Sequence, residues 1–409
     1  MDENEERLGA RAGHHATGSL GLRLETTRRN ATHSEQTQKL KVLFMGRDEF
    51  SCLVLQELHK ARDVWDELVI ATNQDQRVGR RGGQLSVSPL KLMGEALGDI
   101  RLEFIPPTKV EFKKWKLPTP FESYACAADT ANSTNPPPQS HVLVTASFGR
   151  ILTRKHLAHF QPTRRLNVHP SLLPQYRGPA PIQHALLNGE SETGVCVIEM
   201  LPSAKKASGS PLPPKAGIDA GDIWASKSLP QPGDARFNQM RDVLGREGGK
   251  LLVQVLRDMT KIAPVPQKVD ESSEIRPAPM IELGDAHFDP KSFTAEEVYR
   301  RWRAIGHQRP ITTFVEVASS DGSATKRAVQ LHDLQVRLDM LDDALPLSPG
   351  SVICARPSNE PTKSLFIRCE DGGVISVRDI KPEGKPILDA RSFWNGVQGK
   401  HKEVRFVGV

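Results

Sequence analysis

The chain has 409 residues, of which 38% are hydrophobic and 25% are charged. This composition excludes a predominantly disordered protein and leaves room for roughly two or three domains. The formal net charge of +6 favours a polyanionic partner without requiring one. The five cysteines form no CxxC pair, so we expect a reducing compartment and no structural zinc site. No stretch approaches the roughly 18 apolar residues that cross a bilayer, so we expect no membrane-spanning helix.

Residues 1–38 are predicted to be a tail rather than part of a folded domain. The first six residues include four acids, whereas residues 7–34 carry five arginines and a single acid, Glu25, among Ser, Thr, Ala and Gly. The inner stretch has the composition of an organelle transit peptide, and the acidic opening argues against one. A disordered extension and a transit segment are therefore both open at this point.

Ordered structure is predicted from Lys39, in a domain that we place at residues 39–262. Apolar strands alternate with segments of helical pattern along this stretch. The expected elements are strands at 40–46, 67–72, 141–146 and 165–169, helices at about 50–61 and 235–259, and a strand and helix pair within 86–105. Such alternation predicts an α/β fold with an open, mainly parallel, Rossmann-like sheet covered on both faces.

Two stretches interrupt this pattern, and a change of pattern follows it. Residues 116–140 and 201–216 are rich in Pro, Ser and Ala, which predicts surface insertions. Proline-rich residues 263–285 are predicted to be a linker. In the last segment, 286–409, a helix at 294–305 precedes short alternating runs of β-branched and apolar residues. Short strands with turn signals predict a small C-terminal β-barrel, OB-like in class.

A polar pair ends the strand at 165–169. Asn167 and His169 lie one residue apart, so their side chains share a face, at the end of a strand where open α/β sheets collect ligands. Alone, such a pair is more often an ordinary strand end. GIDAGD (217–222) adds Asp219 between glycines. An Asn can donate to an oxyanion, a His can move a proton near neutral pH, and an Asp can orient that His.

These three side chains suit attack on a carbonyl carbon. Ser171 follows His169 but lacks the glycine-flanked turn of a nucleophilic serine. We therefore predict direct transfer to an incoming amine, without a covalent intermediate and without a metal.

The stretch NVHPSLLPQYRGPAPIQHALLNGESETGV (167–195) followed by GIDAGD resembles the signature of the formyltransferases that use 10-formyltetrahydrofolate. The resemblance extends through TASFGRIL (145–152) and APMIE (278–282). It implies that Asn167, His169 and Asp219 are the catalytic residues. It also implies a set of residues that shape the folate and formyl pocket. These are Phe148, Gly149, Ser171, Leu172, Leu173, Pro174, Arg177 and Gly178.

Within that family the chain is most similar to the members that formylate methionyl-tRNA. Glycinamide-ribonucleotide relatives lack both the RGxAPIQ pattern, present here at 177–183, and a C-terminal barrel. Aminoarabinose and dehydrogenase relatives usually carry Asn where this chain has Gln183, and they are fused to large oxidoreductase domains. The resemblance implies a monomer that binds 10-formyltetrahydrofolate and initiator methionyl-tRNA. The arginines of the tail and its scarcity of acids after Glu6 then predict import into the mitochondrial matrix. A formyltransferase for a sugar-nucleotide amine and a non-catalytic RNA-binding protein with this fold are the alternatives.

A second stretch, QDQRVGRRGGQLSVSPLK (74–91), sets Arg77, Arg80 and Arg81 among glycines. Alone, it is typical of a solvated loop. It resembles the mobile basic loop with which the tRNA enzymes contact the acceptor stem, which implies that these three arginines bind tRNA. It has glycines at 82 and 83 where lysines are common in the family.

Overall fold

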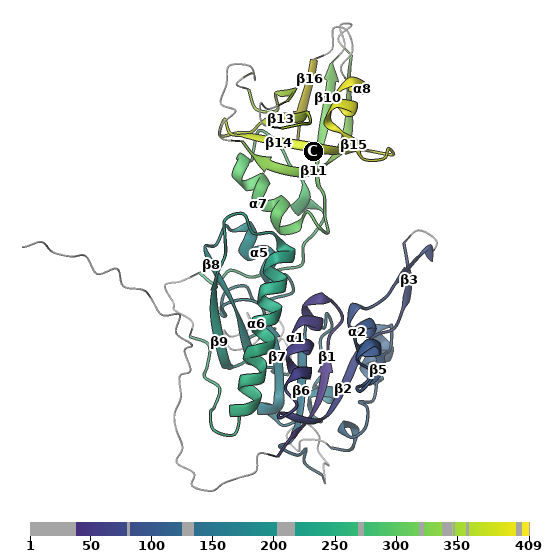
Figure 1. Ribbon diagram of the computed structural model, residues 1–409, viewed down its shortest axis with the longest axis vertical. Coiled ribbons are helices and arrows are strands. Elements are labelled where there is room, and N and C mark those ends of the chain that lie inside the picture. The colour runs from purple at the N-terminus through teal and green to yellow at the C-terminus, as the bar shows by residue number, and fades with distance from the viewer. Residues whose placement is uncertain are drawn as a thin grey trace, which may run out of the picture.

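The computed structural model describes residues 38–79, 82–124, 135–202, 217–268, 274–318, 323–337, 346, 348–356, 360–397 and 403–408. Nearly all of the predicted tail lies outside these described residues, as do Arg80, Arg81, the middle of the first predicted insertion and all but two residues of the second. Two domains are visible in Figure 1, with a mainly parallel sheet below and an antiparallel sheet above it.

The first domain is built on a seven-stranded sheet with the order β5-β2-β1-β6-β7-β8-β9. Its strands are β1 (Leu40–Met45), β2 (Trp65–Asn73), β5 (Arg101–Ile105), β6 (His141–Ala146), β7 (Arg165–His169), β8 (Glu192–Glu199) and β9 (Ile223–Pro230). The pairs from β5 to β7 are parallel, and β8 and β9 are antiparallel. The predicted open, mainly parallel sheet is therefore confirmed.

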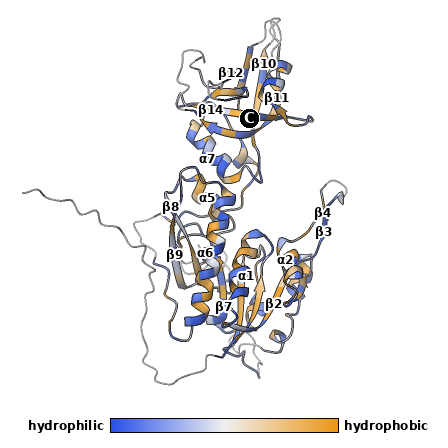
Figure 2. Cartoon of the chain, in the orientation of Figure 1, coloured by the Kyte–Doolittle hydropathy of each residue, from blue (hydrophilic) through white to orange (hydrophobic). Residues whose placement is uncertain are grey.

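Helices cover both faces of this sheet, which explains why β1 is apolar throughout. Val42 and Phe44 pack in one core cluster, and Leu43 packs in another on the opposite face. The first face carries α1 (Glu49–Lys60), α2 (Pro89–Leu97), α5 (Pro181–Leu187) and α6 (Phe237–Asp258). The second carries α3 (Lys109–Lys114), α4 (Arg154–Leu157) and the 3-10 turn Phe121–Ser123. Figure 2 shows the apolar strands between these layers.

Two glycines set the spacing of α6. A Cβ at Gly245 would lie 2.9 Å from the Leu53 Cβ in α1, and one at Gly248 would lie 2.8 Å from a Val168 methyl in β7. These distances are shorter than real Cβ contacts, so the helix reaches α1 and β7 only because both positions lack a side chain.

The predicted basic loop is a hairpin arm instead. β3 (Gln76–Val78) and β4 (Gln84–Ser86) form a two-stranded antiparallel sheet, and the arm extends away from the main sheet in Figure 1. Gly79 and Gly82 have φ of 81° and 67°, conformations that glycine adopts without strain. Strands of three mostly polar residues have no apolar alternation, so sequence patterns do not reveal them.

The second domain begins with α7 (Ala295–Ile305), which starts at a capping box between Thr294 and Glu297. Its sheet has the order β12-β13-β14-β11-β10-β16, with β15 beside β14, and all its pairs are antiparallel. The strands are β10 (Ile311–Ala318), β11 (Ala324–Val336), β12 (Val352–Ala355), β13 (Ser364–Arg368), β14 (Val374–Pro382), β15 (Leu388–Asp389) and β16 (Glu403–Val407). A bridge between Ser351 and Arg405 joins the two edges of the sheet, which therefore curls back on itself. A last helix, α8 (Ala390–Val397), and β16 were not predicted.

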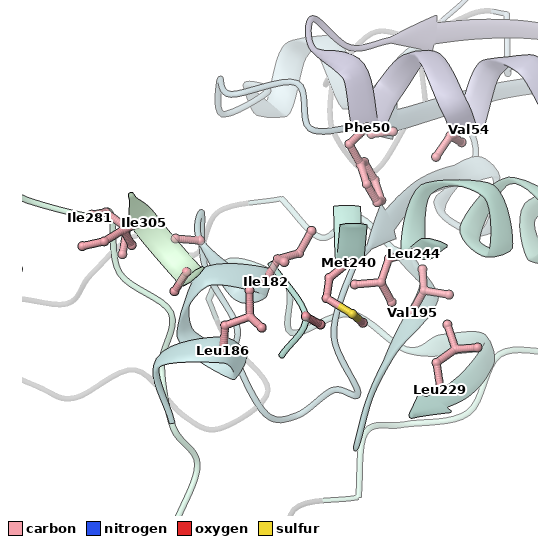
Figure 3. Packing of buried hydrophobic residues seen from close by; sticks show 14 of the residues in the cluster. Phe50, Val54, Ile182, Leu186, Val195, Leu229, Met240, Leu244, Ile281 and Ile305 are labelled. Atoms are coloured by element: carbon pink, nitrogen blue, oxygen red, sulfur yellow. The ribbon is translucent and has the colours of Figure 1, made fainter. Parts of the chain in front are cut away.

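The two domains share one core. Figure 3 shows Ile281 of the connecting segment beside Ile305 of α7, with Ile182 and Leu186 of α5 next to them. On the edge of this contact, the Arg236 guanidinium lies 4.2 Å from the centre of the Trp302 ring. The second domain is thus packed on α5 and α6 rather than tethered by a free linker.

Candidate active site

The three predicted catalytic residues meet at one edge of the first sheet. Strand order reverses between β1 and β6, and open α/β sheets bind ligands at the carboxyl ends of strands at such a reversal. The register sets Thr145 of β6 directly beside Asn167 of β7. His169 follows on the same face, and Asp219 comes from the loop before β9.

Hydrogen bonds to both ends of its amide group orient the Asn167 side chain. The Thr145 hydroxyl donates to its Oδ1 at 2.9 Å, and its Nδ2 donates to Asp219 Oδ1 at 3.1 Å. An amide nitrogen carries two N–H groups, and Asp219 accepts from one. The second N–H can therefore serve a ligand oxygen. Thr145 was not predicted, because a threonine inside a buried strand carries no sequence signal of its own.

His169 is buried, with 3% of its surface exposed. Its Nε2 lies 2.9 Å from the Tyr176 carbonyl oxygen, and its Nδ1 lies 3.6 Å from Asp219 Oδ2. A carbonyl oxygen can only accept, so this hydrogen bond requires the proton on Nε2. Nδ1, which faces Asp219, is then the ring nitrogen that can gain a proton.

Asp219 is held by backbone and side-chain donors. It has φ of 57°, and the Gly178 N–H donates to its Oδ2 at 3.1 Å. Gln267 Nε2 donates to the Asp219 carbonyl at 2.7 Å, and Arg177 donates to Gln267 Oε1 at 2.6 Å. Burial lowers the pKa of Arg177. Gln267 lies in the predicted linker, where nothing in the sequence marks it.

Neither Ser171 nor Cys196, which lie beside the trio, is poised as a nucleophile. The Ser171 hydroxyl is fully buried and donates to the Gln175 carbonyl at 2.8 Å. Cys196 pairs with His169 across β7 and β8, and burial raises the pKa of its thiol to about 12. A thiol acts as a nucleophile through its thiolate, so the raised pKa makes Cys196 a poor nucleophile. Its side chain packs in a small hydrophobic cluster with Leu173 and Ile198.

The other predicted pocket residues lie nearby, with different exposures. Phe148 is buried, with its ring centre 5.8 Å from that of Phe112. Leu172 and Pro174 are half-buried. Gly178 needs to be glycine because a Cβ there would lie 2.4 Å from the Ala278 backbone oxygen, and Gly149 has φ of 74°, a conformation that favours glycine.

Asp48, an acidic residue just after the carboxyl end of β1, was not predicted to belong to the site. Asp48 caps α1 by accepting from the Ser51 N–H at 3.1 Å, and the Ser147 hydroxyl donates to its other oxygen. Burial raises the pKa of this carboxyl group. Asp48 therefore ties the carboxyl end of β1 to that of β6, where the strand order reverses.

A second buried acid lies at the end of β8. Glu199 is 9% exposed, and its Oε1 has no hydrogen-bond partner among the described residues. Burial and the nearby Asp222 raise the pKa of this carboxyl group to about 7, against the opposing effect of Arg165 and Arg164. The Glu199 N–H donates to the Asp222 carbonyl at 2.9 Å, which connects this strand to the loop that carries Asp219.

The predicted tRNA contacts are separate from the trio. Arg77 lies on β3 of the hairpin arm and is exposed. Arg80 and Arg81 fall outside the described residues. Within the described part of the chain, no three His, Cys, Asp or Glu side chains are grouped so that they could hold a metal. No helix described is long and apolar enough to cross a membrane.

The comparisons with known proteins agree with this fold. Residues 39–203 match the formyl transferase family model, and residues 285–398 match that of the formyl transferase C-terminal domain. The chain belongs to the formyl transferase family.

Among its relatives are two proteins named methionyl-tRNA formyltransferase. The mitochondrial protein of Mus musculus is 28% identical over 87% of this chain and 78% of its own length. The protein of Levilactobacillus brevis is 28% identical over 87% of this chain and 95% of its own. A solved sugar 3N-formyl transferase, WlaRD, has the same fold, with a TM-score of 0.50 and 16% identity over 85% of this chain and all of its own.

Proposed function

We propose that this protein transfers the formyl group of 10-formyltetrahydrofolate to the α-amine of methionyl-tRNA. The observation that carries the proposal is the position of Asp219, which accepts from Asn167 and faces His169 at the carboxyl end of β7, the strand next to β6. The similarity to proteins named methionyl-tRNA formyltransferase over 87% of the chain supports the choice of amine.

In the proposed reaction the amine nitrogen attacks the formyl carbon. The new carbon–nitrogen bond forms as the carbonyl oxygen becomes an oxyanion, and the free N–H of Asn167 donates to that oxygen. His169 takes the amine proton on Nδ1, because Tyr176 holds its Nε2 proton. Asp219 stabilises the resulting imidazolium. The bond from the formyl carbon to folate N10 then breaks, and His169 returns the proton to N10.

We assign the folate pocket to Phe148, Gly149 and the loop from Ser171 to Gly178. Because the Ser171 hydroxyl and the Leu173 side chain are used within the protein, these two residues shape the loop. The half-buried Leu172 and Pro174 are the loop side chains that can contact a ligand. Arg177 acts through Gln267 on the Asp219 loop.

We assign tRNA contact to the hairpin arm, through Arg77, Arg80 and Arg81. An arm that extends from the sheet (Figure 1) can reach a nucleic-acid backbone without entering the folate pocket. Phosphate contacts of this kind position a substrate and supply much of its affinity.

We further propose that the protein acts in the mitochondrial matrix and that residues 1–38 direct it there. The arginine-rich composition of residues 7–34 supports this location. Deletion of residues 1–38 should abolish mitochondrial localisation of a fluorescent fusion while leaving formyl transfer in vitro intact. A truncated fusion that still enters mitochondria would locate the signal elsewhere.

The decisive assay supplies labelled 10-formyltetrahydrofolate with either charged initiator methionyl-tRNA or a sugar-nucleotide amine. Formylation of the tRNA by the wild-type chain, and its loss in Asn167→Ala, is the expected result. Transfer to the sugar nucleotide alone would replace the proposed substrate. Binding of tRNA without transfer would indicate a non-catalytic protein.

A further inference from the structure

One residue of the loop from Ser171 to Gly178, which we call the signature loop, has a backbone conformation that its surroundings must maintain. Tyr176 has φ of 62°, a left-handed conformation that is unfavourable for a residue with a Cβ and persists only where other contacts hold it. Its carbonyl oxygen is the atom that accepts from His169 Nε2 at 2.9 Å. Whatever holds Tyr176 in place therefore also holds the imidazole.

The Glu190 side chain holds the hydroxyl end of the Tyr176 side chain, and Arg276 holds Glu190. We call these three residues the clamp. The Tyr176 hydroxyl donates to Glu190 Oε1, and Arg276 Nη1 donates to the same oxygen at 2.6 Å. Asn188 donates to the Tyr176 hydroxyl at 2.9 Å. Burial raises the pKa of Tyr176, so its hydroxyl keeps the proton that it donates.

The segment between the domains also holds the loop, through its backbone. The Tyr176 N–H donates to the Arg276 carbonyl at 2.7 Å, and the Ala278 N–H donates to the Arg177 carbonyl at 2.8 Å. The Ala180 N–H donates to the Ala278 carbonyl at 3.2 Å. The segment thus lies along the signature loop like an added strand, and Arg276 belongs to it.

We propose that Glu190 is a positioning residue: through the Tyr176 hydroxyl it maintains the conformation that aims the Tyr176 carbonyl at His169. Arg276 holds Glu190 from the segment between the domains. This inference rests on the proposed function and extends it to a residue outside the trio and the folate loop.

The clamp contains an ion pair between Arg276 and Glu190 and a hydrogen bond between Tyr176 and Glu190. Their relative strengths decide which of the two a mutation should remove. The Arg276 and Glu190 side chains are 53% and 32% exposed, and ion pairs of this kind contribute little. The Tyr176 side chain is 5% exposed, and a partly buried hydrogen bond to a charged acceptor contributes more. The test therefore targets the bond between Tyr176 and Glu190.

Tyr176→Phe removes only the hydroxyl, and Glu190→Ala removes its acceptor. Each should lower kcat about tenfold, as expected for the loss of one hydrogen bond to a charged group, with both KM values within about twofold of wild type. The double variant should be no worse than either single variant, because both remove the same contact. Glu190→Gln, which keeps an acceptor, should recover part of the activity. Tyr299→Phe, in α7, is the matched control and should retain wild-type kcat.

A second measurement does not depend on turnover. In protein labelled at the histidine ring nitrogens, NMR reports whether His169 Nε2 is held in a hydrogen bond. Tyr176→Phe and Glu190→Ala should shift the His169 Nε2 signal and speed the exchange of its proton. Unchanged signals together with unchanged kcat would overturn the proposal, even if the melting temperature fell. A wild-type chain that transfers no formyl group would refute the proposed function, while these signals would still test the positioning role.

Discussion

Replacing Glu199 with glutamine should stabilise the protein in a way that depends on pH. The pKa of this carboxyl group is about 7 in the folded chain against an ordinary value of 4.5, so the folded state disfavours its ionised form. Each tenfold change in proton affinity is worth about 1.4 kcal/mol. Ionised Glu199 therefore costs the folded state about 3 kcal/mol. Because the folded pKa is the higher one, this cost is absent at low pH, grows as the pH rises from 4.5 to about 7, and is constant above.

Glu199→Gln removes the ionisation and keeps the shape of the side chain. We expect it to raise the free energy of unfolding by about 3 kcal/mol at pH 8 and by less than about 1 kcal/mol at pH 5. Urea unfolding followed by tryptophan fluorescence at both pH values measures the difference. Glu192→Gln, at the exposed start of the same strand, is the control and should change stability by less than about 0.5 kcal/mol at either pH. Equal stabilisation by Glu199→Gln at both pH values, or destabilisation at pH 8, would refute the reasoning.

Three further predictions concern turnover and tRNA binding. Asn167→Ala and His169→Ala should each lower kcat by roughly 10²- to 10⁴-fold with the fold intact; a variant that keeps more than about a third of wild-type activity would exclude that residue from the mechanism. Thr145→Val should lower kcat about tenfold, because it leaves the Asn167 oxygen without its donor, and Thr145→Ser should restore most of it; equal rates in both variants would contradict this role. Arg80→Ala should weaken tRNA binding and flatten the slope of log affinity against log salt by about 0.7 to 0.9, with folate affinity unchanged and a smaller effect from Arg81→Ala. Unchanged salt slopes in both arginine variants would make the tip of the arm an ordinary solvated turn.

Sequence patterns predicted the large elements well, because those elements bury many residues with a regular period. The strands at 141–146 and 165–169 match the structure to the residue, and α6 and α7 differ from their predicted bounds by one or two residues. The meeting of Asn167 with Asp219, more than fifty residues apart, followed from a family resemblance rather than from any pattern.

The contacts that hold the candidate site together were not predictable in the same way. Thr145, Gln267 and Glu190 act through a few side-chain hydrogen bonds each. Their partners come from other strands or from the segment between the domains, so neither spacing nor composition marks them. The hairpin arm was missed for a related reason, since each of its strands has only three residues.

The core shared by the two domains fixes the distance between the second domain and the catalytic trio. Because α7 packs on α5 and the Arg236 guanidinium lies on the Trp302 ring, the second domain has a set position relative to the trio. A substrate that touches both must span that separation. If the tRNA of the proposed function contacts the second domain as well as the hairpin arm, this fixed separation would help to bring its amine to the formyl carbon, and a free amino acid would lack those contacts. Discrimination by length would then need no specific contact with the amino acid at all.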